Sequence, residues 1–100
     1  MTTDPSFRMI VEDVFSIRNR GTVVTGKIET GTLKVGDEIV IRGRNGEKST
    51  TVTGIESFRK VLDQANPGDM VGILLKDVSR EDIQHGDEIL SPRSDFSWKP

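Results

Sequence analysis

The sequence predicts an all-β domain of six strands, arranged as a small closed barrel or a sandwich. Apolar and polar residues alternate with a period of two in three segments, and two more are rich in β-branched and aromatic residues. Turn-forming residues, mainly glycine, aspartate and asparagine, separate the segments at short intervals. A helical signal is confined to residues 79–84, where Ser79 can cap one turn with Asp82 three residues later.

Six segments are expected to form the strands, in this order: residues 7–15, 22–30, 37–42, 49–58, 70–76 and 87–90. The first and fourth are rich in β-branched and aromatic residues, and the second, third and fifth alternate. In the fourth segment, the alternation of apolar residues changes phase between Val52 and Ile55, with Gly54 between them. This change indicates a bulge or a sharp bend. The third and sixth both follow a Gly-Asp pair, in "KVGDEIV" and "QHGDEIL". The glycine supplies an unusual dihedral there, and the aspartate can bond the turn backbone.

The segment Gly21 to Ile28, "GTVVTGKI", is one residue short of the phosphate-binding loop G-x-x-x-x-G-K-[ST]. All four residues inside the frame are β-branched and favour a strand, whereas a phosphate loop needs a flexible backbone followed by a helix. Ile28 offers no hydroxyl to magnesium, and the other motifs of a GTPase are missing. We therefore expect an extended strand, with Lys27 pointing outward.

Composition and single residues argue against most other chemistry. The 100 residues carry a net charge of −2 and no cysteine, which excludes disulfides and gives no support to nucleic-acid binding by charge alone. His85 is the sole histidine, so a histidine-based metal site or a Ser-His-Asp triad has little support. Glu12 and Asp13 are neighbours on an expected strand and should point to opposite faces, so they cannot form a carboxylate pair. No segment is apolar enough to span a membrane.

Two long stretches resemble the second domain of elongation factor Tu, in the translational GTPase family. They are residues 12–41, "EDVFSIRNRGTVVTGKIETGTLKVGDEIVI", and residues 53–90, "TGIESFRKVLDQANPGDMVGILLKDVSREDIQHGDEIL". The resemblance runs from about residue 7 to residue 92 and implies a closed six-stranded Greek-key-like barrel. Residues 1–6 and 93–100 are polar and contain proline, so we expect them to form loose tails. The resemblance also implies a cytoplasmic location.

In this family a GTPase domain precedes the barrel, and the sequence contains no such domain. The chain fits either a separate protein or an excised piece. GTP and magnesium would bind only through the absent GTPase domain, so we expect no cofactor and no enzymatic activity in the chain itself.

The resemblance implies that the barrel holds the aminoacylated 3′ end of transfer RNA in a groove. The matching residues are Glu12, Asp13, Phe15, Thr25, Arg59 and Met70. By this resemblance, Glu12 would meet the terminal ribose and adenine region. Asp13 and Met70 would face the amino group and carbonyl of the amino acid. The phenylalanine and threonine would line the side-chain pocket, and the arginine would lie near the terminal phosphate.

Each of these residues can also be explained without RNA binding, as an ordinary residue of the core, the rim, an edge strand or a loop. The sequence departs from the family pattern twice. Met70 stands where the pattern has a polar side chain, commonly asparagine, and methionine is only a weak acceptor, which puts one polar contact in doubt. Asn19 replaces a turn glycine, and asparagine tolerates the left-handed conformation.

We expect the domain to bind aminoacyl-transfer RNA or ribosomal RNA weakly. We expect no binding to a membrane. A second hypothesis is a protein-interaction barrel that docks a GTPase domain or a regulator through an exposed apolar patch involving Phe58, Val61 and Leu62. A third, an autonomous GTPase, lacks the required motifs.

Overall fold

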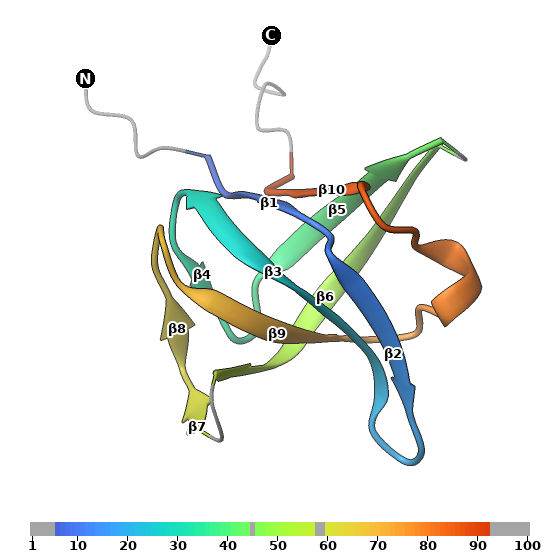
Figure 1. The fold of residues 1–100 in the computed structure, drawn as a ribbon, viewed down its shortest axis with the longest axis horizontal. Helices are drawn as coiled ribbons and strands as arrows, with labels where there is room; N and C mark the ends of the chain where they lie inside the picture. Colours follow the sequence, from blue (N-terminus) through green and yellow to red (C-terminus); the bar gives the residue numbers. More distant parts are fainter. Residues whose placement is uncertain (1–5, 45, 58–59, 93–100) are drawn as a thin grey trace, which may run out of the picture.

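The computed structural model describes residues 6–44, 46–57 and 60–92 as a closed antiparallel β-barrel (Figure 1). Six strands form the ring: β1 (Arg8–Ile10), β3 (Gly21–Thr30), β5 (Glu38–Gly43), β6 (Gly46–Ser57), β9 (Met70–Leu75) and β10 (Glu88–Leu90). Around the barrel their order is β1, β10, β5, β6, β9 and β3, and β3 pairs with β1 to close the ring. The predicted closed six-stranded barrel is confirmed.

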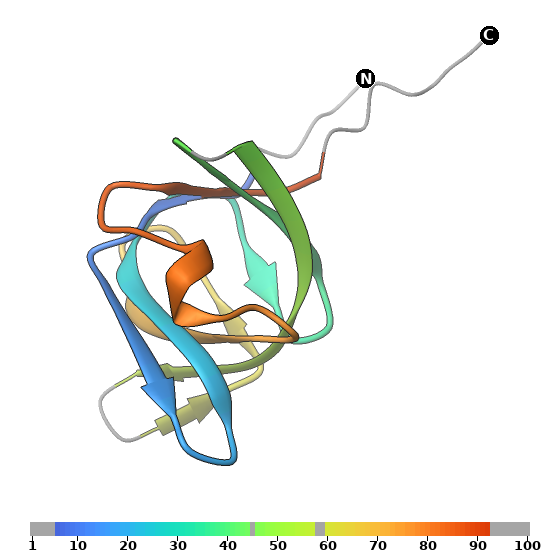
Figure 2. The same cartoon turned by 90° about the vertical axis from the view of Figure 1, so that its right-hand side faces the viewer.

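Four short strands and one helical turn complete the described chain: β2 (Asp13–Ile17), β4 (Leu33–Lys34), β7 (Lys60–Leu62), β8 (Gln64–Ala65) and the 3₁₀ turn η1 (Arg80–Asp82). Strand β2 pairs with β3, β7 with β6, and β4 with β8. The helical turn lies across one end of the ring of strands (Figure 2). In the residues that the structure describes, no helix is long and apolar enough to cross a membrane.

The turn η1 occurs where the sequence predicted one. The backbone N–H of Ser79 donates to the Asp82 carboxylate at 3.0 Å, which confirms the capping interaction. Val78 and Ile83, on either side of the turn, are buried. The turn thereby closes one end of the barrel core with apolar side chains.

The expected first strand, residues 7–15, is in fact two strands. β1 ends at Ile10 and β2 begins at Asp13, so two residues lie between them. One of these, Val11, is held by the turn that precedes β10: its N–H donates to the Asp87 carbonyl (2.9 Å), and its carbonyl accepts from the Gly86 N–H (2.8 Å). Strand β2 then forms a hairpin with β3 that extends past the ring (Figure 1).

Alternate residues of the ring strands fill the interior, as the period of two predicted. The buried set includes Met9, Val24, Ile28, Ile39, Ile41, Val52, Ile55, Val71, Ile73, Leu75 and Ile89. The predicted bulge in the fourth segment is confirmed, because the register between β6 and β9 shifts between Val52 and Gly54. The alternating pattern of β9 placed Leu74 on the side of the strand that faces away from the core, yet its side chain is only 8% exposed. Its cross-strand partner on the outside of the barrel is Val23, so two apolar side chains lie side by side there.

The two Gly-Asp turns have the same geometry, as predicted. Gly36 and Gly86 have φ of 99° and 94°, and the following aspartates accept the N–H of Lys34 and Gln84, both at 2.9 Å. A third turn of this kind occurs at residues 66–69. Asn19 takes the left-handed conformation with φ 66°, so the β2–β3 turn forms without glycine at that position.

Candidate functional site

The candidate site lies on the outer face of the sheet formed by β2, β3, β9, β6 and β7, called the outer face below. One row of directly paired residues crosses all five strands: Asp13, Thr25, Gly72, Glu56 and Val61. Side chains of directly paired residues lie on the same side of a sheet. Because the alternate residues of these strands pack in the core, this row points away from it.

A hollow of about 240 Å³ opens on the outer face. Its lining is mainly apolar and consists of Thr25, Glu56, Ser57, Met70, Val71 and Gly72. Gly72 contributes no side chain to the row. A β carbon added there would lie 3.3 Å from Val23 Cγ1 and 3.8 Å from Thr25 Cγ2, so the glycine keeps this part of the surface open.

The structure brings four of the six predicted site residues onto this face. Thr25 and Met70 line the hollow, and Met70 is 43% exposed. Asp13 is the direct cross-strand partner of Thr25. Phe15 follows two residues later on the same strand, so it shares the face with Asp13, and it is 49% exposed.

Glu12 lies beside these residues without belonging to a strand. Its backbone N–H donates to the Thr25 carbonyl at 2.8 Å, and its side chain is exposed. We predicted that Glu12 and Asp13 point to opposite faces because they are neighbours on one strand. The assumption that Glu12 lies on a strand was wrong, because it occupies the break between β1 and β2. The sixth predicted residue, Arg59, lies outside the described residues.

Besides the buried Val71, three further lining residues, Glu56, Ser57 and Gly72, were not among the predicted site residues. The Ser57 hydroxyl donates to the Met70 carbonyl at 2.9 Å, and Glu56 forms an ion pair with Arg20 from the β2–β3 turn. The sequence did offer a signal for Gly72, because it is a glycine on the outward side of an alternating strand. Nothing local marks the other two, because the pairing of β6 with β9 brings them to the hollow.

Three of the four remaining ion pairs in the described residues form one ladder across the strands at which the barrel closes. Arg8 pairs with Glu29 and Glu88, and Arg42 also pairs with Glu88 at 2.6 Å, so one ladder crosses β3, β1, β10 and β5. Hydrogen bonds from Arg42 and Arg8 lower the pKa of the Glu88 carboxyl. The hydrogen bond to Glu88 raises the pKa of Arg8. These charges satisfy one another and tie together the strands at which the barrel closes.

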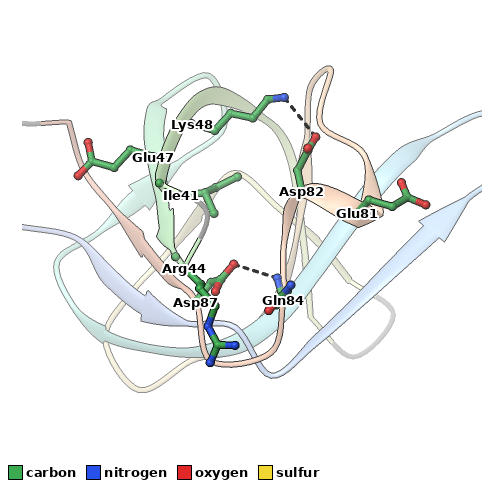
Figure 3. Close-up of a pocket in the computed structure, with 10 residues that line it drawn as sticks. Ile41, Arg44, Glu47, Lys48, Glu81, Asp82, Gln84 and Asp87 are labelled. Carbon is green, nitrogen blue, oxygen red and sulfur yellow. Dashed lines mark hydrogen bonds and ion pairs between the residues drawn. The ribbon is translucent and has the colours of Figure 1, made fainter.

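A second hollow, of about 300 Å³, lies at the end of the barrel between the β5–β6 hairpin and η1 (Figure 3). The buried side chain of Ile41 forms its floor. Lys48 Nζ reaches across to Asp82 at 3.2 Å, and the Asp87 carboxylate accepts the Gln84 N–H (Figure 3). Lys48, Asp82 and Asp87 therefore already have partners within the domain, and the predicted site residues Thr25 and Met70 line the other hollow, on the outer face.

In the described ranges, no metal-binding cluster is found, and the segment that resembles a phosphate loop does not form one. Within them, no three His, Asp or Glu side chains come together as a metal site would require. The segment from Gly21 to Ile28 is extended in β3 and pairs with β2 and β9 on its two sides. The predicted strand is confirmed, with Lys27 exposed, and the backbone amides of this segment are engaged in the sheet.

The sequence was compared with models of protein families. The model of the family described as elongation factor Tu domain 2 matches residues 21–90. Three predicted site residues, Thr25, Arg59 and Met70, lie within the matched range.

Proposed function

The chain belongs to the elongation factor Tu domain 2 family, and on that premise we propose that its outer face binds the aminoacylated 3′ end of transfer RNA without catalysing a reaction. One observation carries the proposal: Asp13, Phe15, Thr25 and Met70, which come from the three strands β2, β3 and β9, share one face around the hollow beside Gly72. The bound group would be an amino acid esterified to a terminal adenosine.

The chemistry of the face suits such a ligand. The Asp13 carboxylate can accept hydrogen bonds from an α-ammonium group, and charge-assisted bonds of this kind are the strong ones. The exposed ring of Phe15 and the apolar lining near Met70 offer surface to a side chain or a base. The carboxylate of Glu56 can accept from ribose hydroxyls once Arg20 moves aside.

Binding by the isolated barrel is expected to be weak. The hollow is open on the outer face, and the chain carries a net charge of −2, which gives no general attraction to phosphates. Methionine at position 70 supplies only a weak acceptor. We expect a Kd on the order of 100 µM or higher, comparable with non-specific contacts between proteins and nucleic acids.

The test is a titration of the ¹⁵N-labelled domain with a non-hydrolysable aminoacyl-adenosine, followed by NMR. Amide shifts should cluster at Asp13, Phe15, Thr25 and Gly72. If millimolar ligand moves none of these amides, the proposal is wrong.

A matched pair of variants sharpens this test. Gly72→Ala adds one methyl group inside the hollow, where the added carbon meets Val23 and Thr25 at van der Waals distance or slightly closer. Ser49→Thr adds one methyl group at an exposed β6 position that does not line the hollow. Gly72→Ala should weaken binding by about threefold or more, since part of the ligand's space is filled, and Ser49→Thr should leave it unchanged.

A second function, docking of a protein domain, is favoured by a separate observation. Four of the five large hydrophobic side chains that are exposed in the described ranges belong to the outer face or its margin: Phe15, Ile17, Val61 and Met70. Val61, which the sequence placed in an apolar patch, is 80% exposed, whereas Leu62 packs against the core. Phe58 lies outside the described residues. The occupant would be a GTPase domain, in the same chain or another.

The two functions can be separated experimentally. Val61 does not line the hollow, so Val61→Asp should reduce capture of a GTPase domain while leaving the aminoacyl-adenosine titration unchanged. Capture that persists after RNase treatment would support docking of a protein. Capture that disappears on RNase treatment would support the RNA-binding function instead.

A further inference from the structure

The two methionines in the described ranges have opposite environments. Met9 on β1 is fully buried, with 0% of its surface exposed, and its Cγ and Cε lie close to Gly26 in the barrel core. Met70 at the start of β9 is 43% exposed and lines the hollow on the outer face. A thioether that water can reach is open to oxidation, whereas a buried one is protected by the packing around it.

We propose that Met70 is an oxidation site, and that its conversion to methionine sulfoxide by peroxide closes the hollow to its ligand. The first half concerns the domain alone, and the second rests on the proposed function. The oxidant is a hydroperoxide, with hydrogen peroxide as the simplest member of the class.

The chemistry balances without any group that the domain must supply. The sulfur lone pair of Met70 attacks one oxygen of hydrogen peroxide, an S–O bond forms, and the O–O bond breaks. The departing hydroxide takes up the proton of the transferred hydroxyl and leaves as water. Sulfur loses two electrons and the peroxide gains them, and a sulfoxide reductase can reverse the change.

The effect on the hollow follows from the position of the side chain. Thr25, Val71 and Gly72 make the lining around Met70 mainly apolar. A sulfoxide places a strongly polar, chiral S–O group on this wall, where an apolar part of a ligand would otherwise pack. Burying that group under a ligand without a donor is unfavourable, so the oxidised domain should bind an apolar ligand group less well.

The first experiment needs no ligand. The whole chain is exposed to hydrogen peroxide, and the oxidation of each methionine peptide is followed by mass spectrometry. Met70 should oxidise about tenfold faster than Met9 or more, because reaction follows exposure. Equal rates for the two peptides, or resistance of Met70, would overturn the proposal.

The second experiment measures the effect of oxidation on the hollow and on its ligand. Oxidation of the ¹⁵N-labelled domain should shift the amides of Thr25, Ser57 and Gly72, and sulfoxide reductase should restore them. Peroxide should also raise the Kd for the aminoacyl-adenosine about fivefold in the wild type. In Met70→Leu, peroxide treatment should not change the Kd of that variant, whatever its starting value.

The outcomes separate this inference from the proposed function. If the reduced domain binds no aminoacyl-adenosine, the proposed function fails, and selective oxidation of Met70 with the amide shifts still supports the oxidation site. If the reduced domain binds the ligand and the oxidised domain binds it equally well, the proposed control of the hollow is wrong. A loss of binding in peroxide-treated Met70→Leu would also contradict it, because another residue would then be responsible.

Discussion

Gly26 lies on β3 between the residues that pair with β2 and those that pair with β1, and the contact between β1 and β3 closes the barrel. An alanine β carbon there would point inward, too close to the carbonyl oxygen of Ile10 and 3.1–3.2 Å from Met9. The oxygen belongs to the backbone of β1, which is also held by β10, so it cannot rotate away as a side chain can. Gly26→Ala therefore forces β1 and β3 apart.

The expected loss of stability can be estimated from two contributions. Overpacking a filled core costs about 1–3 kcal/mol, and weakening one hydrogen bond between β1 and β3 adds about 1 kcal/mol. The free energy of unfolding should fall by about 2–4 kcal/mol, and a domain of this size loses roughly 4–8 °C of Tm per kcal/mol. A decrease in Tm of about 8–32 °C should result.

Urea and thermal unfolding followed by circular dichroism would measure the change. Gly72→Ala is the matched control, since the same substitution on the neighbouring strand meets a side chain at 3.3 Å and no backbone atom. Its stability should stay within about 1 kcal/mol of the wild type, because alanine also favours the strand over glycine. A Gly26→Ala domain that unfolds within about 1 kcal/mol of the wild type would refute the reasoning about the closure of the barrel.

Three more predictions concern charges and turns. Glu88→Gln removes the carboxylate shared by Arg8 and Arg42, so the urea midpoint should fall at pH 7. Because the pKa of Glu88 is lowered in the folded state, its contribution is complete above the ordinary pKa and is lost as the pH falls through the lowered one. The difference between variant and wild type should therefore shrink in acid, and a difference independent of pH would contradict this. Asp69→Ala removes the acceptor of the Asn66 N–H and should cost about 1 kcal/mol in urea unfolding, whereas Asp69→Asn, which keeps an oxygen acceptor, should cost less. Asp13→Asn should weaken binding of aminoacyl-adenosine about threefold or more in the NMR titration and leave adenosine unaffected, because only the former carries an ammonium group; equal loss for both ligands would place Asp13 elsewhere in the site.

The turns and the inward parity of the strands were predictable because they depend on neighbouring residues. Gly36 and Gly86 take the positive φ that their turns require, and Val52 and Ile55 both face inward across the bulge. The site was only partly predictable. Thr25 and Met70, two of the predicted site residues, line the hollow, whereas Glu56 and Ser57 were missed.

The sequence by itself determined where the six strands of the ring lie, which side of each faces the core, and where the Gly-Asp turns occur. Periodicity and turn chemistry act over a few residues, so a single segment contains the information. The tertiary structure alone decided that the first strand breaks at Val11 and Glu12, that β3 closes the ring against β1, and that Glu56 lies beside Gly72. These features depend on the register between strands distant in the sequence, and a strand's own residues do not specify which partner, or which residue of it, will lie opposite.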